Sequence, residues 1–210
     1  MKHLLLLGDG PAHLHVLKSL GQERLAVGRV SLVAPSAEPL CAAMLPRWVA
    51  GRASEERCRL PLAALARAAG ADFIEASVQS LDLAARSLQL SSGSAIGYDA
   101  LSLDIAPEIA PEALPGAREL GLFVHPLQHF SQLWPRLRAL AEARPLCIVV
   151  IGGDVLAVEL AFALERALGR DSRISLVSGS GGLLPDFAER ARHRVQDKLR
   201  QRRITLFGED

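Results

Sequence analysis

The chain of 210 residues contains only three cysteines, and their spacing excludes most cysteine chemistry. Cys41, Cys58 and Cys147 lie far apart in the sequence, and no C-x-x-C pair occurs. Neither a disulfide scaffold nor a zinc site is therefore indicated. A redox-active disulfide built from one local motif is also excluded.

An excess of charge of one sign and long apolar runs are lacking as well. The formal net charge is +1, which gives no electrostatic reason to expect nucleic acid or an anionic membrane as a partner. No apolar run reaches the length of a membrane span, and no signal peptide is visible. We therefore expect a cytoplasmic protein with no transmembrane segment. Half of the residues are hydrophobic, so the chain is able to bury a sizeable core.

Two segments of the chain share one order of elements: buried strand, glycine turn, helix, buried strand. In the first, the apolar run 4–7 leads into Gly8, and a β-branched strand follows at 30–33. In the second, the run 148–151 leads into Gly152, and the next strand is expected at 174–177. A continuous apolar strand followed by a helix is typical of a parallel sheet covered on both faces. The sequence therefore predicts an α/β protein of two tandem Rossmann-like units with parallel sheets.

The residues between these segments predict a small antiparallel element and a linker. A strand is expected at 72–77, and the stretch 87–103 is typical of a β-hairpin or meander that belongs to the first unit. Three prolines within 106–115 indicate a crossing linker. We therefore expect a first unit at 1–115, a connecting segment with a helix at 116–144, and a second unit at 145–210.

The first glycine turn keeps two of the three glycines of the Gly-x-Gly-x-x-Gly pattern. In that pattern the first glycine permits a tight turn, the second lets a pyrophosphate approach the backbone, and the third lets helix and strand pack closely. The amides at the helix N-terminus then bind the phosphates. Gly8 and Gly10 occupy the first two positions, and His13 occupies the third.

The second glycine turn departs further from the pattern. Gly152 takes the first position, Asp154 the second and Ala157 the third. A carboxylate at the second position would repel a pyrophosphate and block its approach, so we do not expect tight NAD binding by this unit. Both units also lack the acidic residue expected at the end of the second strand to hold the ribose hydroxyls. The first has Ala-Pro-Ser at 34–36, and the second has Ser-Gly-Ser at 178–180.

The order of the motifs adds a family resemblance. The motifs are the two glycine turns, Met-Leu-Pro at 44–46, Leu-Asp-Leu-Ala-Ala-Arg at 81–86, and Tyr-Asp-Ala-Leu-Ser-Leu-Asp-Ile at 98–105. In this order they resemble the pyridine nucleotide-disulfide oxidoreductase superfamily. Within it the chain is most similar to the branch of type II NADH dehydrogenases and sulfide:quinone reductases. The nearest likeness is to the flavoprotein module sometimes fused to selenide, water dikinase.

The resemblance implies a non-covalent FAD on the first unit and NAD(P)H on the second, where the sequence makes binding doubtful. Hydride would pass from nicotinamide to flavin, and then to a quinone or another small-molecule electron acceptor. A homodimer is the candidate assembly. The sequence forces no general acid or base and no metal ligand, so none is assigned.

Carried over by position, the resemblance gives a set of candidate cofactor-binding residues. The pyrophosphate would lie at the first glycine turn, the ribose at the end of the second strand, the adenine at residue 78, and the flavin ring near 44–46. Residues 104–106 stand where the family usually has Ala-Thr-Gly. On the first unit the candidates are Gly8, Gly10, Pro11, Ala12, His13, Ala34, Pro35, Met44, Leu45, Pro46, Val78, Asp104, Ile105 and Ala106; on the second unit they are Gly152, Gly153, Asp154, Val155, Leu156 and Glu159.

Family members are considerably longer, and a returning segment with a Gly-Asp motif completes their FAD domain. We therefore expect this chain to be truncated or to rely on a partner, with weak or absent FAD. Two other hypotheses stay open. One is a degenerate dinucleotide-fold module that binds without turnover, and the other is a single-Rossmann dehydrogenase with no flavin, which leaves the second turn unexplained.

Overall fold

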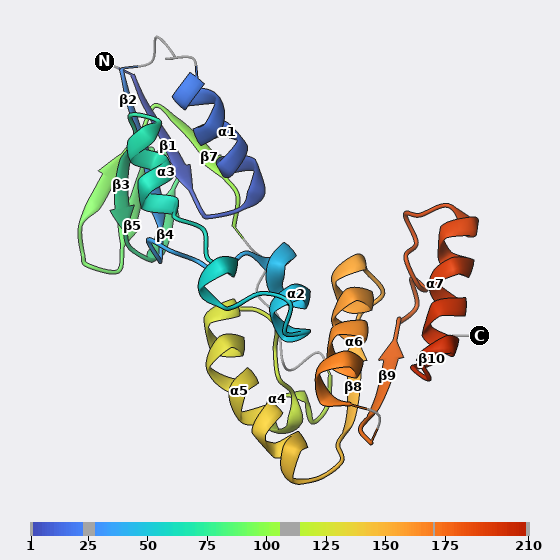
Figure 1. Cartoon of the computed structure of the whole chain (residues 1–210). Helices are drawn as coiled ribbons and strands as arrows, with labels where there is room; N and C mark the ends of the chain where they lie inside the picture. Colours follow the sequence, from blue (N-terminus) through green and yellow to red (C-terminus); the bar gives the residue numbers. More distant parts are fainter. Residues whose placement is uncertain (1, 23–27, 106–113, 170, 209–210) are drawn as a thin grey trace. The chain divides into compact units, whose positions relative to one another are not determined.

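The computed structural model of the chain describes residues 2–22, 28–105, 114–169 and 171–208 (Figure 1). The chain forms two compact units. The first consists of Met1–Pro39 and Arg59–Glu119, and the second consists of Leu40–Cys58 and Leu120–Asp210. The segment Leu40–Cys58 therefore packs as part of the second unit, although the sequence on both sides of it belongs to the first.

The first unit is built on a four-stranded parallel sheet. Across the sheet the strands are β3 (Asp72–Glu75), β2 (Arg29–Ala34), β1 (His3–Leu7) and β7 (Ala100–Leu103). Helix α1 (Pro11–Gln22) connects β1 to β2, and helix α3 (Leu62–Ala68) lies between β2 and β3 in the chain. Parallel neighbours need such crossover connections. Strands β2 and β3 are added on one side of β1, and β7 is added on the other side. The strand order therefore reverses at β1, while all four strands stay parallel.

Alternation along the strands gives this sheet two apolar faces, and each is covered. Leu6 and Leu32 pack with Leu17 of α1 and Leu62 of α3. On the opposite face, Leu5 packs against a second, antiparallel sheet. Its strands are β4 (Val78–Asp82), β5 (Ser87–Leu90) and β6 (Ala95–Gly97), in that order, and Leu88 and Leu90 of β5 are among the buried residues. Figure 1 shows the helices and the small sheet on opposite sides of the parallel sheet.

The second unit contains a three-stranded parallel sheet in the order β10 (Thr205–Phe207), β9 (Arg173–Val177) and β8 (Cys147–Ile151). Its helices are α2 (Leu45–Val49), α5 (Leu127–Ala143), α6 (Val155–Leu168) and α7 (Glu189–Gln201), and it also contains the short 3-10 turns η1 (Ala42–Met44) and η2 (Glu56–Cys58). The short helix α4 (Ala117–Leu120) lies at the boundary between the two units. Helix α6 presents Val158, Ala161 and Leu164 to the core at helical spacing, and α2 packs on it. The predicted fold class, with two parallel βαβ units and a small meander, is confirmed.

One face of strand β8 departs from the expectation that both faces of the sheet are covered. Val150 lies in the core, whereas Val149 and Ile151 are 56% and 61% exposed. Cys147, two residues before Val149, is exposed as well. Side chains alternate along a strand, so these three residues form one exposed, apolar row.

Candidate functional site

The first glycine turn lies at the carboxyl edge of the first unit's parallel sheet. Strand β1 ends at Leu7, and the Gly8 N–H donates to the Val33 carbonyl of β2 at 2.9 Å. The Gly10 N–H donates to the Asp104 carbonyl, directly after β7, at 3.1 Å. In open α/β sheets, ligands bind at this edge where the strand order reverses. The turn is therefore where a dinucleotide site is expected.

Both glycines of this turn lie against the chain segment that follows β7, Gly8 against its backbone and Gly10 against a side chain. Gly8 has a φ of +110°, and a Cβ added there would collide with the Asp104 carbonyl. A Cβ added at Gly10 would collide with the Asp104 carboxylate. The space that a pyrophosphate needs beside the second glycine is thus filled by an acidic side chain of the protein.

The Asp104 carboxylate also binds the first amides of α1. Its Oδ2 accepts the N–H of Ala12 at 2.7 Å and that of His13 at 3.2 Å. Helix N-termini favour negative charge because their first amides have no partner within the helix. These amides are the ones that the sequence assigns to the pyrophosphate. A pyrophosphate therefore does not fit here while Asp104 holds them, and it reaches them only when that side chain leaves.

The His13 side chain lies in the interior, beneath the turn, and is fully buried. Its Nδ1 lies 2.9 Å from the Gly8 carbonyl, and its Nε2 lies 3.0 Å from the Ser102 hydroxyl on β7. A carbonyl only accepts, so Nδ1 carries a hydrogen. In place of the third glycine, an imidazole thus joins α1 to the turn and to β7. His13 offers its backbone amide, rather than its ring, at the anion position.

The second glycine turn occupies the corresponding edge of the second unit. The Gly152 N–H donates to the Val177 carbonyl of β9 at 2.8 Å. A Cβ added at Gly153 would collide with the Gly182 carbonyl and would lie 3.0 Å from the Ser178 carbonyl. The Leu184 N–H donates to the Gly153 carbonyl at 2.7 Å. The loop after β9 therefore packs directly on this turn.

Asp154 is the N-cap of α6. Its Oδ1 accepts the Ala157 N–H at 2.8 Å, and its extended backbone is typical of a cap residue. The sequence predicts repulsion of a pyrophosphate at this residue, and the carboxylate does lie at the helix N-terminus. The hydrogen bond from the Ala157 N–H to the Asp154 carboxylate also stabilises α6.

The other candidate residues are dispersed. Ala34 is buried at the end of β2 and Pro35 beside it is exposed, while Val78 is half-buried at the start of β4. Leu45 and Pro46 are buried in the second unit, and Met44 packs against the same core. Pro11, Ile105, Val155 and Glu159 are exposed, Leu156 is half-buried, and Ala106 lies outside the described residues. The cofactor contacts of all these residues stay predictions.

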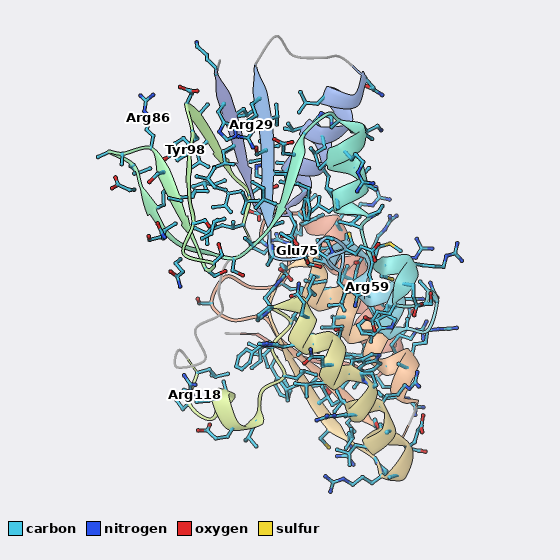
Figure 2. All side chains as sticks on the ribbon, turned by 90° about the vertical axis from the view of Figure 1, so that its left-hand side faces the viewer. Arg29, Arg59, Glu75, Arg86, Tyr98 and Arg118 are labelled. Atoms are coloured by element: carbon cyan, nitrogen blue, oxygen red, sulfur yellow. The ribbon has the colours of Figure 1, made fainter. Side chains whose placement is uncertain are left out.

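A carboxylate that the sequence did not single out lies beside the expected ribose position. Glu75 of β3 is paired with Ala34 at the end of β2, and its Oε1 accepts the Ala37 N–H at 3.4 Å. Arg59 reaches the same loop, where it donates to the Glu38 carbonyl at 3.0 Å (Figure 2). In the usual pattern the acidic residue stands at the end of the second strand itself. Only the register of β2 against β3 brings Glu75 there.

Cys58 has a structural environment. It is buried in the second unit, and its thiol donates to the Met44 carbonyl at 3.7 Å. Burial, and after it the neighbouring Cys41, raises the pKa of Cys58 above its usual value. A raised pKa keeps the sulfur as a thiol, and the thiolate is the reactive form. Within the described ranges, no three His, Cys, Asp or Glu side chains are grouped to hold a metal.

Two parallel βαβ units with glycine turns at their carboxyl edges define a tandem dinucleotide-fold protein. Residues 2–207 match the family described as pyridine nucleotide-disulphide oxidoreductase, and the chain belongs to this family. The predicted superfamily resemblance is thus confirmed. Among the helices that the structure describes, none is both long enough and apolar enough to cross a membrane.

Several known proteins are similar to the chain. Demethylphylloquinone reductase NdbB of Synechocystis sp. is 26% identical over 155 residues, which cover 71% of this chain and 38% of that protein. A ferredoxin reductase from Rhodopseudomonas palustris has a TM-score of 0.79 and 19% identity, over 99% of this chain and 50% of that one. The sulfide:quinone oxidoreductase of Aquifex aeolicus has a TM-score of 0.73 and 20% identity, over 99% of this chain and 51% of that one. The chain thus spans about half the length of these structures, and the likeness to them shows the fold.

Proposed function

We propose that the chain carries the first half of an FAD-dependent NAD(P)H oxidoreductase. In the whole protein, FAD would supply the electron chemistry, taking hydride from a nicotinamide nucleotide and passing electrons to a quinone or another small acceptor. The family match over residues 2–207 is the observation that carries the proposal. The similarity to a demethylphylloquinone reductase supports a quinone as the acceptor.

The first unit is the proposed flavin-nucleotide unit, because its glycine turn lies where the strand order reverses at β1. The amides of Ala12 and His13 would bind the pyrophosphate once Asp104 has released them. The loop after β2 and the Glu75 carboxylate would face the adenosine ribose. The chain's own residues thus bind and orient the nucleotide, and none of them is assigned a proton-transfer step.

The second unit is proposed to contribute weakly to nicotinamide-nucleotide binding. The Asp154 carboxylate holds the Ala157 amide, and the Gly182 carbonyl takes the space beside Gly153. Both contacts occupy positions that a pyrophosphate would need.

A second candidate function is a dinucleotide-fold module that binds a partner or a nucleotide without turnover. The observation that favours it is shared by the two units: after each glycine turn, a carboxylate of the chain itself accepts backbone N–H groups in the first turn of the helix, those of Ala12 and His13 in α1 and that of Ala157 in α6.

The two candidates are separated by the flavin content of the purified protein. If the protein is the proposed oxidoreductase, it should show a flavin absorption spectrum, as purified or after addition of FAD. Anaerobic addition of NADH should bleach this spectrum. A folded protein that takes up no FAD, both as this chain and as any longer product of its reading frame, contradicts the oxidoreductase and supports the module. A flavin spectrum that NADH leaves unchanged, in the chain and in any longer product of its reading frame, contradicts the NAD(P)H step.

A further inference from the structure

We propose that Asp104 is an internal competitor of the dinucleotide pyrophosphate, so that its side chain sets the affinity of the first unit for nucleotide. This inference deepens the proposed function and rests on it for the identity of the ligand. The carboxylate holds two amides at the N-terminus of α1, and these are the amides at which a pyrophosphate would bind.

The contacts of Asp104 resemble those of a bound anion. One oxygen accepts from Ala12 and His13, and bonds from backbone amides to an ionised acceptor are shorter and stronger than neutral ones. The partial positive charge at the N-terminus of α1 favours the carboxylate for the same reason that it would favour a phosphate. Two anions at these amides would repel each other, so binding of one requires departure of the other.

The backbone of Asp104 is hydrogen-bonded through both its N–H and its carbonyl, so departure of the carboxylate needs a rotation of the side chain alone. The Asp104 N–H donates to the Leu7 carbonyl at 2.9 Å, and the Asp104 carbonyl accepts the Gly10 N–H at 3.1 Å. These bonds tie the residue to the end of β1 and to the turn. Rotation about the side-chain bonds moves the carboxylate away from the amides and leaves both backbone bonds intact.

The absence of a side chain at Gly10 makes room for the Asp104 carboxylate. The absence of a side chain at the second glycine is usually explained by the approach of a pyrophosphate. Here the Asp104 carboxylate makes that approach, since a Cβ at Gly10 would collide with its Cγ and both oxygens. The same opening in the backbone thus admits either the internal carboxylate or the nucleotide, and it cannot admit both.

The test compares four versions of the 210-residue chain: the wild type, Asp104→Ala, Asp104→Asn, and the matched control Asp82→Asn. Asp82 is another carboxylate of the first unit that accepts a backbone N–H, that of Ala85 at 2.8 Å, away from the glycine turn. Binding of FAD is measured by quenching of flavin fluorescence. Binding of inorganic pyrophosphate is followed by the NMR shifts of the Ala12 and His13 amides. Circular dichroism establishes that each variant is folded, and Asp104→Asn keeps an acceptor for the helix if Asp104→Ala unfolds.

We expect Asp104→Ala to bind FAD at least tenfold more tightly than the wild type, Asp104→Asn to lie between them, and Asp82→Asn to match the wild type. Folded Asp104 variants that bind FAD no more tightly than the wild type overturn the inference. If the wild type binds FAD well in the same experiment, the proposed function is left intact. An equal gain in Asp82→Asn also overturns it, because the effect is then one of overall charge. If no protein binds FAD but pyrophosphate shifts the Ala12 and His13 amides in Asp104→Ala alone, the inference stands and the FAD assignment fails. Failure of every variant to bind either probe overturns the inference.

Discussion

The imidazole of His13 in α1 and the hydroxyl of Ser102 in β7 are joined across 89 residues of sequence by a contact of 3.0 Å. The other ring nitrogen of His13 reaches the Gly8 carbonyl at 2.9 Å. The ring therefore links helix, turn and strand at the point where the first glycine turn is formed. The position that a third glycine fills in the usual pattern has become a hydrogen-bonded core position.

His13→Ala should destabilise the protein strongly. The change removes a fully buried ring and leaves the Gly8 carbonyl without its partner, so we expect a loss of about 3 kcal/mol in the free energy of unfolding. Urea unfolding measures it. His15→Ala, an exposed position on the same helix, is the control and should change stability by less than about 0.5 kcal/mol. Equal effects of the two changes would refute the structural role of the ring.

Asp154→Ala should lower the free energy of unfolding by about 1 kcal/mol, because α6 loses its N-cap. Asp154→Ser keeps an acceptor for the Ala157 amide and should retain most of the stability. Thermal unfolding of both variants, beside an exposed control change such as Asp171→Ala, tests this. A loss in Asp154→Ser as large as that in Asp154→Ala would show that charge, rather than capping, is responsible.

Cys58 should make stability fall at alkaline pH. Because burial raises the pKa of its thiol, the folded state holds the proton more tightly than the unfolded state. This contribution is complete below the unfolded pKa and is lost as the pH rises above it. Denaturant unfolding near neutral pH and at about pH 10 should therefore show a smaller alkaline loss in Cys58→Ala than in the wild type. Cys147→Ala, at an exposed thiol, should keep the wild-type loss, and identical alkaline losses in all three proteins would contradict the assignment.

Glu75→Gln should weaken FAD binding about tenfold if its carboxylate accepts a ribose hydroxyl. The change preserves the shape of the side chain and removes its charge. Asp72→Asn is the control, since Asp72 lies at the other end of β3 and pairs with Arg29 at 2.9 Å. Flavin fluorescence titrations in the wild-type and Asp104→Ala backgrounds give the dissociation constants. Unchanged affinity in Glu75→Gln would remove Glu75 from the site.

The exposed row on β8 should bind an apolar dye. Val149 and Ile151 are adjacent on one face of the strand, and contiguous exposed apolar surface promotes association. The double change Val149→Thr and Ile151→Thr should reduce dye fluorescence and concentration-dependent association in gel filtration. Leu120→Thr removes an exposed leucine from the same unit outside the row and should have little effect. If Leu120→Thr has the larger effect, the row is not the associating surface.

The sequence predicts the sheets well because their signal is local. The apolar runs at 4–7 and 148–151, each followed by a glycine, suffice to place β1 and β8 in parallel sheets. The contacts at the glycine turns are not local. Asp104 meets Ala12 from a separation of 92 residues, and no periodicity reveals that its carboxylate would turn toward α1.

Non-local contacts also decide the surroundings of Glu75 and of residues 44–46, so the sequence alone does not predict them. Strand register decides that Glu75 stands beside Ala34, and register is not readable from a short apolar strand. Leu45 packs in the core of the second unit, and its predicted position near the flavin ring stays a prediction of the family resemblance. Asp154 differs in that its contact is local: an aspartate directly before a helix caps that helix, and its effect on a bound phosphate stays a prediction.

The affiliation of Leu40–Cys58 with the second unit has a practical consequence for dissecting the protein. The chain passes between the units at 39/40, 58/59 and 119/120, so no single cut yields two intact halves. A fragment that ends at Glu119 carries α2 without α6, and one that begins at Leu120 carries α6 without α2. Two such fragments expressed together hold matching apolar surfaces, and mixing them is the route to reconstituting the second unit from separate polypeptides.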